Sequence, residues 1–164
     1  MKKIIFNLFL ILIFSTNVSL SETIDEIKII GNKRISNETI IVLGDIDIGT
    51  KYTNDKLNNT LRKLYETNFF SDINITFNNE ILKIELTENP IIEKINIAGI
   101  KKKSLIEALK DSMTLKDRMS YTEFEFNKDI NQIKNILKTS GYYFSSIKVS
   151  KQENSEFNSI LLNL

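Results

Sequence analysis

Apolar and polar side chains alternate along two neighbouring stretches in the first half of the chain. Residues 72–78 read "DINITFN" and residues 81–88 read "ILKIELTE", with Ile, Leu or Phe at every second position of each alternating run. This period of two places all the apolar side chains on one face of a strand. The short "NNE" between the two runs is typical of a turn. We therefore expect a hairpin with one buried and one solvated face.

A different period precedes the hairpin and recurs later in the chain. Apolar side chains follow the i, i+4, i+7 spacing of a helix within residues 57–65 and again within residues 126–137. Shorter apolar segments, "NETIIVLG" and "LIEALKDSM", predict a short helix before each long one. Ser104 with Glu107, and Thr122 with Glu125, have the spacing of capping boxes at helix starts. Each long helix has one apolar stripe, which requires a sheet or helix to pack on.

The chain contains the same unit twice. Aligning "EIKIIGNKRIS" (26–36) with "KINIAGIKKKS" (94–104) places Gly31 on Gly99 with an offset of 68 residues. After the second pair of helices, "SSIKVSK" and "NSILLNL" predict two strands separated by a polar loop around "QENSE". Each copy is therefore β-α-α-β-β, an α+β fold with a three-stranded mixed sheet covered on one face by two helices. We expect domains at residues 22–89 and 90–164, the last strand of the second being truncated.

The only proline of the chain lies between the two copies. Pro90 follows the last strand of the first copy and precedes the first strand of the second, and a residue without an N–H is typical of a strand boundary. Asn89 and Pro90 are therefore predicted to form the inter-domain joint. Domains of this size bury only about 60% of their unfolded surface, so we expect the two to support each other.

The N-terminus predicts export. Lys2 and Lys3 precede an apolar run from Ile4 to Phe14 and then small polar residues, which is the pattern of a secretory signal peptide at residues 1–21. A membrane anchor is the alternative. Eleven helical residues span only about 16 Å, roughly half of a bilayer core, which favours cleavage. No cysteine follows the run, which argues against a lipoprotein.

Composition argues against several classes of function. The chain has no histidine and no cysteine, so thiolate nucleophiles, zinc sites and the commonest general base are missing. The carboxylate pairs "DID" (45–47) and "EFE" (123–125) are spaced i, i+2 and diverge on a helix. We expect neither an enzyme nor a cofactor or metal site.

The charge of the chain gives no reason to expect a nucleic-acid partner. Without the signal peptide the net charge is near −1, and "KKK" (101–103) is interpreted as a solvated turn.

The motifs resemble a known family. The opening "IKIIGNKRI" (27–35), the helix-to-strand passage "LYETNFFSDINI" (64–75) and the joint "ENPIIEKINIAGIKK" (88–102) resemble the first two POTRA domains of the BamA family of outer-membrane protein assembly factors. The resemblance implies a periplasmic module on the inner side of a Gram-negative outer membrane. It also implies a C-terminal barrel that is missing from this chain, as expected of a fragment. The implied partners are unfolded β-barrel proteins and accessory lipoproteins.

Three alternatives to this interpretation remain open. The first is a POTRA pair of a two-partner secretion or translocation-and-assembly transporter, and the second is a free-standing periplasmic interaction module. The third is an envelope or cell-division protein, which would need an uncleaved anchor.

A backbone mechanism follows from the predicted sheets. An edge strand offers unpaired N–H and C=O groups to any extended peptide, so strand addition tolerates many sequences. The resemblance implies that the strand after the helices is the docking edge in each copy. The apolar side chains of this strand are expected to belong to the core. A proline at Asn74 or Thr76, whichever N–H faces outward, is the corresponding test. The predicted edge residues are Asp72, Ile73, Asn74, Ile75, Thr76 and Phe77, with Ser146, Ile147, Lys148, Val149 and Ser150 in the second copy.

Overall fold

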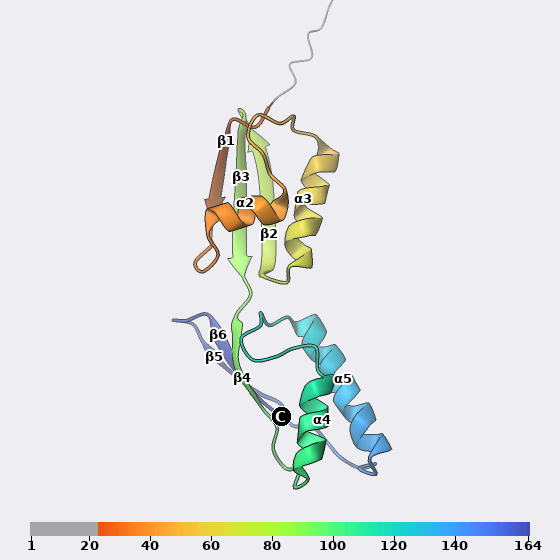
Figure 1. Cartoon of the computed structure of the whole chain (residues 1–164). Helices are drawn as coiled ribbons and strands as arrows, with labels where there is room; N and C mark the ends of the chain where they lie inside the picture. The colour runs from red at the N-terminus through yellow and green to blue at the C-terminus, as the bar shows by residue number, and fades with distance from the viewer. Residues whose placement is uncertain (1–22) are drawn as a thin grey trace, which may run out of the picture.

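A computed structural model of the chain describes residues 23–164. The predicted signal peptide at residues 1–21 lies outside the described residues. The described part forms two α+β units placed end to end, each with helices on one face of a small sheet (Figure 1).

The first domain is built around a long central strand. Its sheet has the order β1-β3-β2, with β1 parallel and β2 antiparallel to β3. Helices α2 and α3 pack on one face of this sheet (Figure 1). The elements are β1 (Glu26–Ile30), α2 (Asn37–Gly44), α3 (Asn54–Glu66), β2 (Phe70–Asn78) and β3 (Ile81–Glu88).

The second domain repeats the arrangement with a shorter antiparallel pair of strands. Its sheet has the order β4-β6-β5, again with one parallel and one antiparallel pair. The prediction of two tandem three-stranded mixed sheets with helices is confirmed. The elements are β4 (Ile91–Asn96), α4 (Lys103–Ser112), α5 (Glu123–Thr139), β5 (Ser150–Asn154) and β6 (Ser159–Asn163).

Side-chain caps fix where three of the helices begin. Ser36, Thr53 and Thr122 each accept a hydrogen bond from the backbone N–H three residues later, as N-cap residues do. The predicted capping box at Ser104 is wrong. Helix α4 begins two residues earlier than this box predicts, at Lys103, its N-cap residue is Lys102, and no side chain caps it.

The hairpin between β2 and β3 has a tight two-residue loop. Asn79 and Glu80 both have positive φ, 51° and 64°, as a type I′ turn requires. The turn closes on the pair Asn78–Ile81, which sets an unbroken register back to Asp72. This register determines which backbone groups of β2 remain unpaired.

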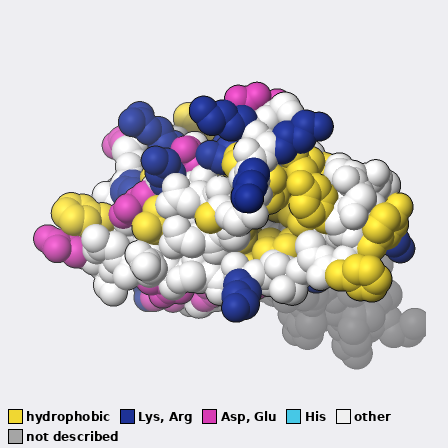
Figure 2. Space-filling model, turned by 90° about the horizontal axis from the view of Figure 1, so that it is seen from below, with side chains coloured by type: hydrophobic (Ala, Val, Ile, Leu, Met, Phe, Trp, Pro, Cys, Tyr) yellow, Lys and Arg dark blue, Asp and Glu magenta, His cyan; other side chains and the backbone are white. Residues whose placement is uncertain are grey.

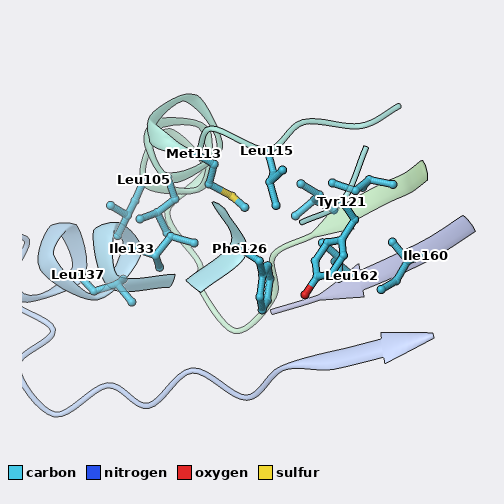
Figure 3. Packing of buried hydrophobic residues seen from close by; sticks show 12 residues of the cluster. Leu105, Met113, Leu115, Tyr121, Phe126, Ile133, Leu137, Ile160 and Leu162 are labelled. Atoms are coloured by element: carbon cyan, nitrogen blue, oxygen red, sulfur yellow. The ribbon is translucent and has the colours of Figure 1, made fainter. Parts of the chain in front are cut away.

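Each domain has its own apolar core under its helices. In the second domain, Tyr121 and Phe126 lie beside Leu162 from the central strand, and further side chains come from α4, α5, β4, β6 and the segment between the two helices (Figure 3). In the first domain, Ile73 is buried, and Ile75 and Phe77 pack at the margin of the corresponding cluster. These three side chains therefore belong to the core, as the alternation predicted.

The predicted edge strand of the second copy is placed too early. Only Ser150 lies in β5, which continues to Asn154, while residues 146–149 form an irregular segment. The pair Ser150–Asn163 is the last in the antiparallel register, so within the described residues 146–149 are not paired with β6, although Ile147 and Val149 alternate as in a strand. The polar segment "SKQEN", read as strand end and loop, is the actual strand.

Candidate peptide-binding edges and the inter-domain joint

The two sheets have four edge strands, and they differ in how accessible their backbone is. An edge strand can bind an extended peptide only where its outward N–H and C=O groups are free. Strands β1 and β2 border the first sheet, and β4 and β5 border the second.

The outer edge of β4 is covered by the segment from Asp117 to Tyr121. The N–H of Arg118 donates to the Ile92 carbonyl at 2.7 Å, and the N–H of Ile92 donates to the Met119 carbonyl at 2.9 Å. A carboxylate oxygen of Asp117 accepts from the N–H of Ile95 at 2.8 Å. This edge is therefore occupied by the chain itself.

Strand β5 is short and has a charged side chain on its helix-facing side. The Nζ of Lys151 lies 2.6 Å from a carboxylate oxygen of Glu123 and 4.8 Å from the centre of the Phe126 ring. Burial acts to lower the pKa of Lys151, but its hydrogen bonds with Glu123 and Tyr121 outweigh burial and raise it. An inward-pointing charge on an edge strand opposes the addition of another strand. Edge β5 is therefore protected.

Strand β1 is also a poor template. It has five residues, and the chain entering it is paired on the far side from β3. The N–H of Ile24 donates to the Thr50 carbonyl at 3.0 Å, and the N–H of Gly49 donates to the Ile24 carbonyl at 2.6 Å. A short strand with a paired entry leaves few backbone groups for a partner.

Strand β2 is the longest edge, with nine residues. In an antiparallel ladder, residue pairs that exchange hydrogen bonds alternate with pairs that do not. The turn makes Asn78–Ile81 a hydrogen-bonded pair. The backbone groups that form hydrogen bonds to β3 therefore belong to Asp72, Asn74, Thr76 and Asn78. The backbone groups of the residues between them, Ile73, Ile75 and Phe77, point outward. The N–H of Ile73 agrees with this assignment, since it donates to the Tyr65 hydroxyl instead of to β3.

The expected proline test at Asn74 or Thr76 is therefore misplaced. In this register both N–H groups donate to β3, so a proline there would remove a ladder bond within the sheet. The outward donors belong to the core-facing residues. The sequence could not reveal this, because the alternation of side chains is independent of which pairs carry hydrogen bonds.

The helix-covered side of the β2 edge is aromatic and apolar. The rings of Tyr52 and Phe77 stack with their centres 4.0 Å apart and an interplanar angle of 11°. Leu61 of α3 packs at the margin of the core, and Tyr65, one turn later, is about half exposed. A strand added along β2 would place alternate side chains against this surface.

A buried carboxylate organises the joint between the two domains. The Oε1 atom of Glu88 accepts hydrogen bonds from the backbone N–H groups of Lys33, Arg34 and Ile35 at 2.8–3.1 Å. Its Oε2 atom lies 2.9 Å from Nε of Arg34. Burial acts to raise the pKa of Glu88, but these hydrogen bonds outweigh burial and lower it. Glu88 therefore remains charged and fixes the basic loop after β1 onto the end of β3.

A hydrogen bond also crosses the joint, because the side chain of Asn158 donates to the Glu88 carbonyl at 3.1 Å. On the first-domain side, the Nη2 atom of Arg34 donates to the Asn89 carbonyl at 2.7 Å. The predicted joint residues Asn89 and Pro90 thus lie between β3 and β4, within contacts from both domains. Neither Glu88 nor Asn158 was identified from the sequence. The spacing of 54 residues between Arg34 and Glu88 gives no local signal.

A groove of about 930 Å³ runs beside the joint. Its walls come from Tyr65 and Ser71 of the first domain and from Glu123 and Glu153 of the second. The groove begins where β2 begins, so the open edge of the first sheet leads directly into it.

A second hollow lies at the far end of the second domain. It has a volume of about 500 Å³ and is lined mainly by apolar side chains, among them Ile100, Leu137 and Ile147. From this end of the molecule, hydrophobic side chains gather on one half of the surface with Lys and Arg around them (Figure 2). Tyr143 and Phe144, which follow the end of α5, are 68% and 102% exposed.

The described residues contain no cluster of acidic, histidine or cysteine side chains that could hold a metal ion. Among the helices of residues 23–164, none is long and apolar enough to cross a membrane.

Comparison with known proteins identifies the fold family. The sequence profile of POTRA, described as "Surface antigen variable number repeat", matches residues 22–89 and again residues 90–163. The chain is 29% identical over 129 residues to the outer membrane protein assembly factor BamA of Neorickettsia risticii (strain Illinois). That match covers 79% of this chain and 17% of the relative, so the chain spans only a small part of that protein's length.

A solved structure shares the fold. The N-terminal domain of Omp85 from Thermosynechococcus elongatus superposes with a TM-score of 0.53 at 14% identity, covering 85% of this chain and 60% of that one. The POTRA1-3 segment of the periplasmic domain of Omp85 from Anabaena gives a TM-score of 0.48 at 12% identity, covering 85% and 59%. The resemblance seen in the sequence is thus confirmed, and the chain belongs to the POTRA family, of which it contains two tandem copies.

Proposed function

We propose that this chain is a periplasmic module of an outer-membrane protein assembly factor, which binds extended segments of unfolded β-barrel proteins by adding a strand to β2. Membership of the POTRA family and similarity to a BamA protein support the cellular role. The observation that carries the binding mode is the difference between the four edges. Strand β2 is long and open, β4 is covered, β5 is charged on its inner side, and β1 is short.

The backbone of β2 offers a small set of partners to an incoming strand. The N–H groups of Ile75 and Phe77 and the carbonyls of Ile73, Ile75 and Phe77 face outward in the observed register. At a net value of about 0.5–1.5 kcal/mol each, five bonds contribute roughly 2.5–7.5 kcal/mol. Association costs about 4 kcal/mol or more. The expected dissociation constant is around millimolar and reaches the high micromolar range where side chains also pack.

Weak binding suits a protein that must release its client. Backbone recognition imposes few sequence requirements, and the surface of Tyr52, Leu61 and Phe77 favours apolar residues at alternate positions of the client. Strands of outer-membrane barrels have this alternation of apolar and polar residues. An accessory lipoprotein that docks through a strand would compete for the same edge.

The test uses peptides that differ only in their backbone. One peptide of alternating Val and Thr, with a Lys at each end, is titrated into the isotope-labelled protein and followed by NMR. A matched peptide carries N-methyl groups on the amides of both edges, which removes the donors and leaves the side chains unchanged. We expect the first peptide to shift the amide signals of Ile75 and Phe77 and to leave those of β5 unchanged. The methylated peptide should not bind.

Equal binding of both peptides would contradict strand addition, because side chains alone would then account for the affinity. Shifts confined to β5 would contradict the assignment of the edge. A variant with proline at Ile75 lacks one outward donor, and Ile75→Ala is its control for the lost side chain. Only the proline variant should lose binding beyond the effect of the control.

A further inference from the structure

The hydroxyl of Tyr65 occupies one of the three outward N–H groups of β2. Its oxygen accepts from the N–H of Ile73 at 3.1 Å. Within the described residues, no side-chain acceptor is assigned to the outward N–H groups of Ile75 and Phe77. The open edge is therefore divided into a free part toward the hairpin and a capped part toward the joint.

The position of Tyr65 is fixed by a short and well-bonded connection. Helix α3 ends at Glu66 and β2 begins at Phe70. The Thr67 hydroxyl donates to the Leu64 carbonyl at 2.6 Å and accepts from the N–H of Phe69 at 3.1 Å. The last turn of α3 is thereby fixed against the start of the strand, which places the phenol ring at the end of the edge.

Tyr65 also borders the groove between the domains, together with Ser71 and residues of the second domain. A peptide strand that paired with the whole of β2 would pass the phenol ring to enter this groove. The tyrosine thus lies at the boundary between the free edge and the groove. Its hydroxyl supplies the bond that a longer client would otherwise make.

We propose that Tyr65 is a specificity-determining residue that ends the docking edge, so that a bound strand pairs with Ile75, Phe77 and the Ile73 carbonyl and stops short of the Ile73 N–H. This inference rests on the proposed strand addition at β2. Its consequence is a limit on the length of client strand that contributes to affinity. Client segments longer than the free edge gain nothing from their additional residues.

Two substitutions separate the hydroxyl from the ring. Tyr65→Phe removes the acceptor and keeps the ring, whereas Tyr65→Ala also removes the obstacle, and alanine is a strong helix former. Tyr143→Phe, at an exposed position of the second domain, is the matched control. Amide hydrogen exchange of the free protein should become about fivefold faster at Ile73 in Tyr65→Phe, as the loss of one hydrogen bond implies. Exchange at Ile84 in the core should not change.

Binding of peptides of two lengths tests the limit directly. The wild-type protein should bind a peptide of about six residues and one of about ten residues with similar affinity. Tyr65→Ala should bind the longer peptide roughly tenfold more tightly and the shorter one as before, because the Ile73 backbone becomes available. A wild-type protein that already prefers the longer peptide as strongly as the variant does would overturn the inference and leave strand addition intact.

Unchanged exchange at Ile73 in Tyr65→Phe would also overturn it, since the hydroxyl would then not cap that N–H. Absence of binding by either peptide to any variant, with faster exchange at Ile73, would instead refute strand addition itself. The proposed role of Tyr65 in docking would then be refuted as well. The two failures are thus distinguishable in one set of samples.

Discussion

The equivalent glycines Gly31 and Gly99 provide a matched test of how tightly the first sheet is packed. Both follow the first strand of their domain and both have positive φ, 97° and 80°. A Cβ atom built on Gly31 would lie 2.0 Å from the carbonyl oxygen of Leu86, where real Cβ atoms essentially never approach within 3.0 Å. A Cβ atom on Gly99 has no atom within 4 Å.

The expected energies differ accordingly. Alanine at positive φ costs about 1–2 kcal/mol, and this term is common to both positions. At Gly31 the backbone must also move by about 1 Å away from β3, which weakens one or two ladder bonds at about 0.5–1.5 kcal/mol each. We expect Gly31→Ala to cost about 3 kcal/mol and Gly99→Ala about 1 kcal/mol. For a domain of this size the former lowers Tm by roughly 12 °C or more.

Urea unfolding of the purified protein, followed by circular dichroism and by NMR signals of each domain, measures both costs. The loss in Gly31→Ala should appear in the first domain, and β2–β3 amides should lose protection. If the two variants lose the same free energy of unfolding, the close approach of Gly31 to Leu86 does not constrain the sheet, and the reasoning is refuted.

Three further predictions concern charge and the joint. Because the pKa of Glu88 is lowered by folding, its stabilisation is present above the ordinary value of 4.5 and is lost as pH falls through the lower folded value. Glu88→Gln should therefore lower Tm near neutral pH, with the two melting curves converging in acid. Lys151→Met should expose the β5 edge and increase self-association in size-exclusion chromatography, whereas Lys148→Met should not. Asn158→Ala should cost about 1 kcal/mol and let the domains reorient, which NMR relaxation would detect as two tumbling times.

Periodicity predicted the parts of the fold whose causes are local. The alternation in residues 72–88 specified both the hairpin and its buried face, and Thr122 specified the start of α5. Strand β5 was missed because "SKQEN" contains no apolar residue, and its pairing with β6 decides its structure. The accessibility of the four edge strands could not be predicted from the sequence either. It depends on contacts such as Asp117 on Ile95, whose positions are 22 residues apart.

Tyr65 illustrates the same limit at the candidate site. In the sequence it completes the apolar stripe of a helix, and only the register of β2 shows that its hydroxyl reaches an outward N–H. The network of Glu88 likewise joins positions more than fifty residues apart. Residues that act on an edge or a joint are identified by what lies opposite them, which a single sequence does not contain.

The passage from β3 through Pro90 into β4 determines how the module responds to mechanical load. Strand β3 is the middle strand of its sheet, and β4 is an outer strand of the next. Tension applied across the joint would load β3 in shear between two neighbours, so many bonds would resist together. Strand β4 has one neighbouring strand and the Asp117–Tyr121 segment, so its bonds would yield at lower force. Under tension the second domain would extend first, while the sheet that carries the open edge stays folded.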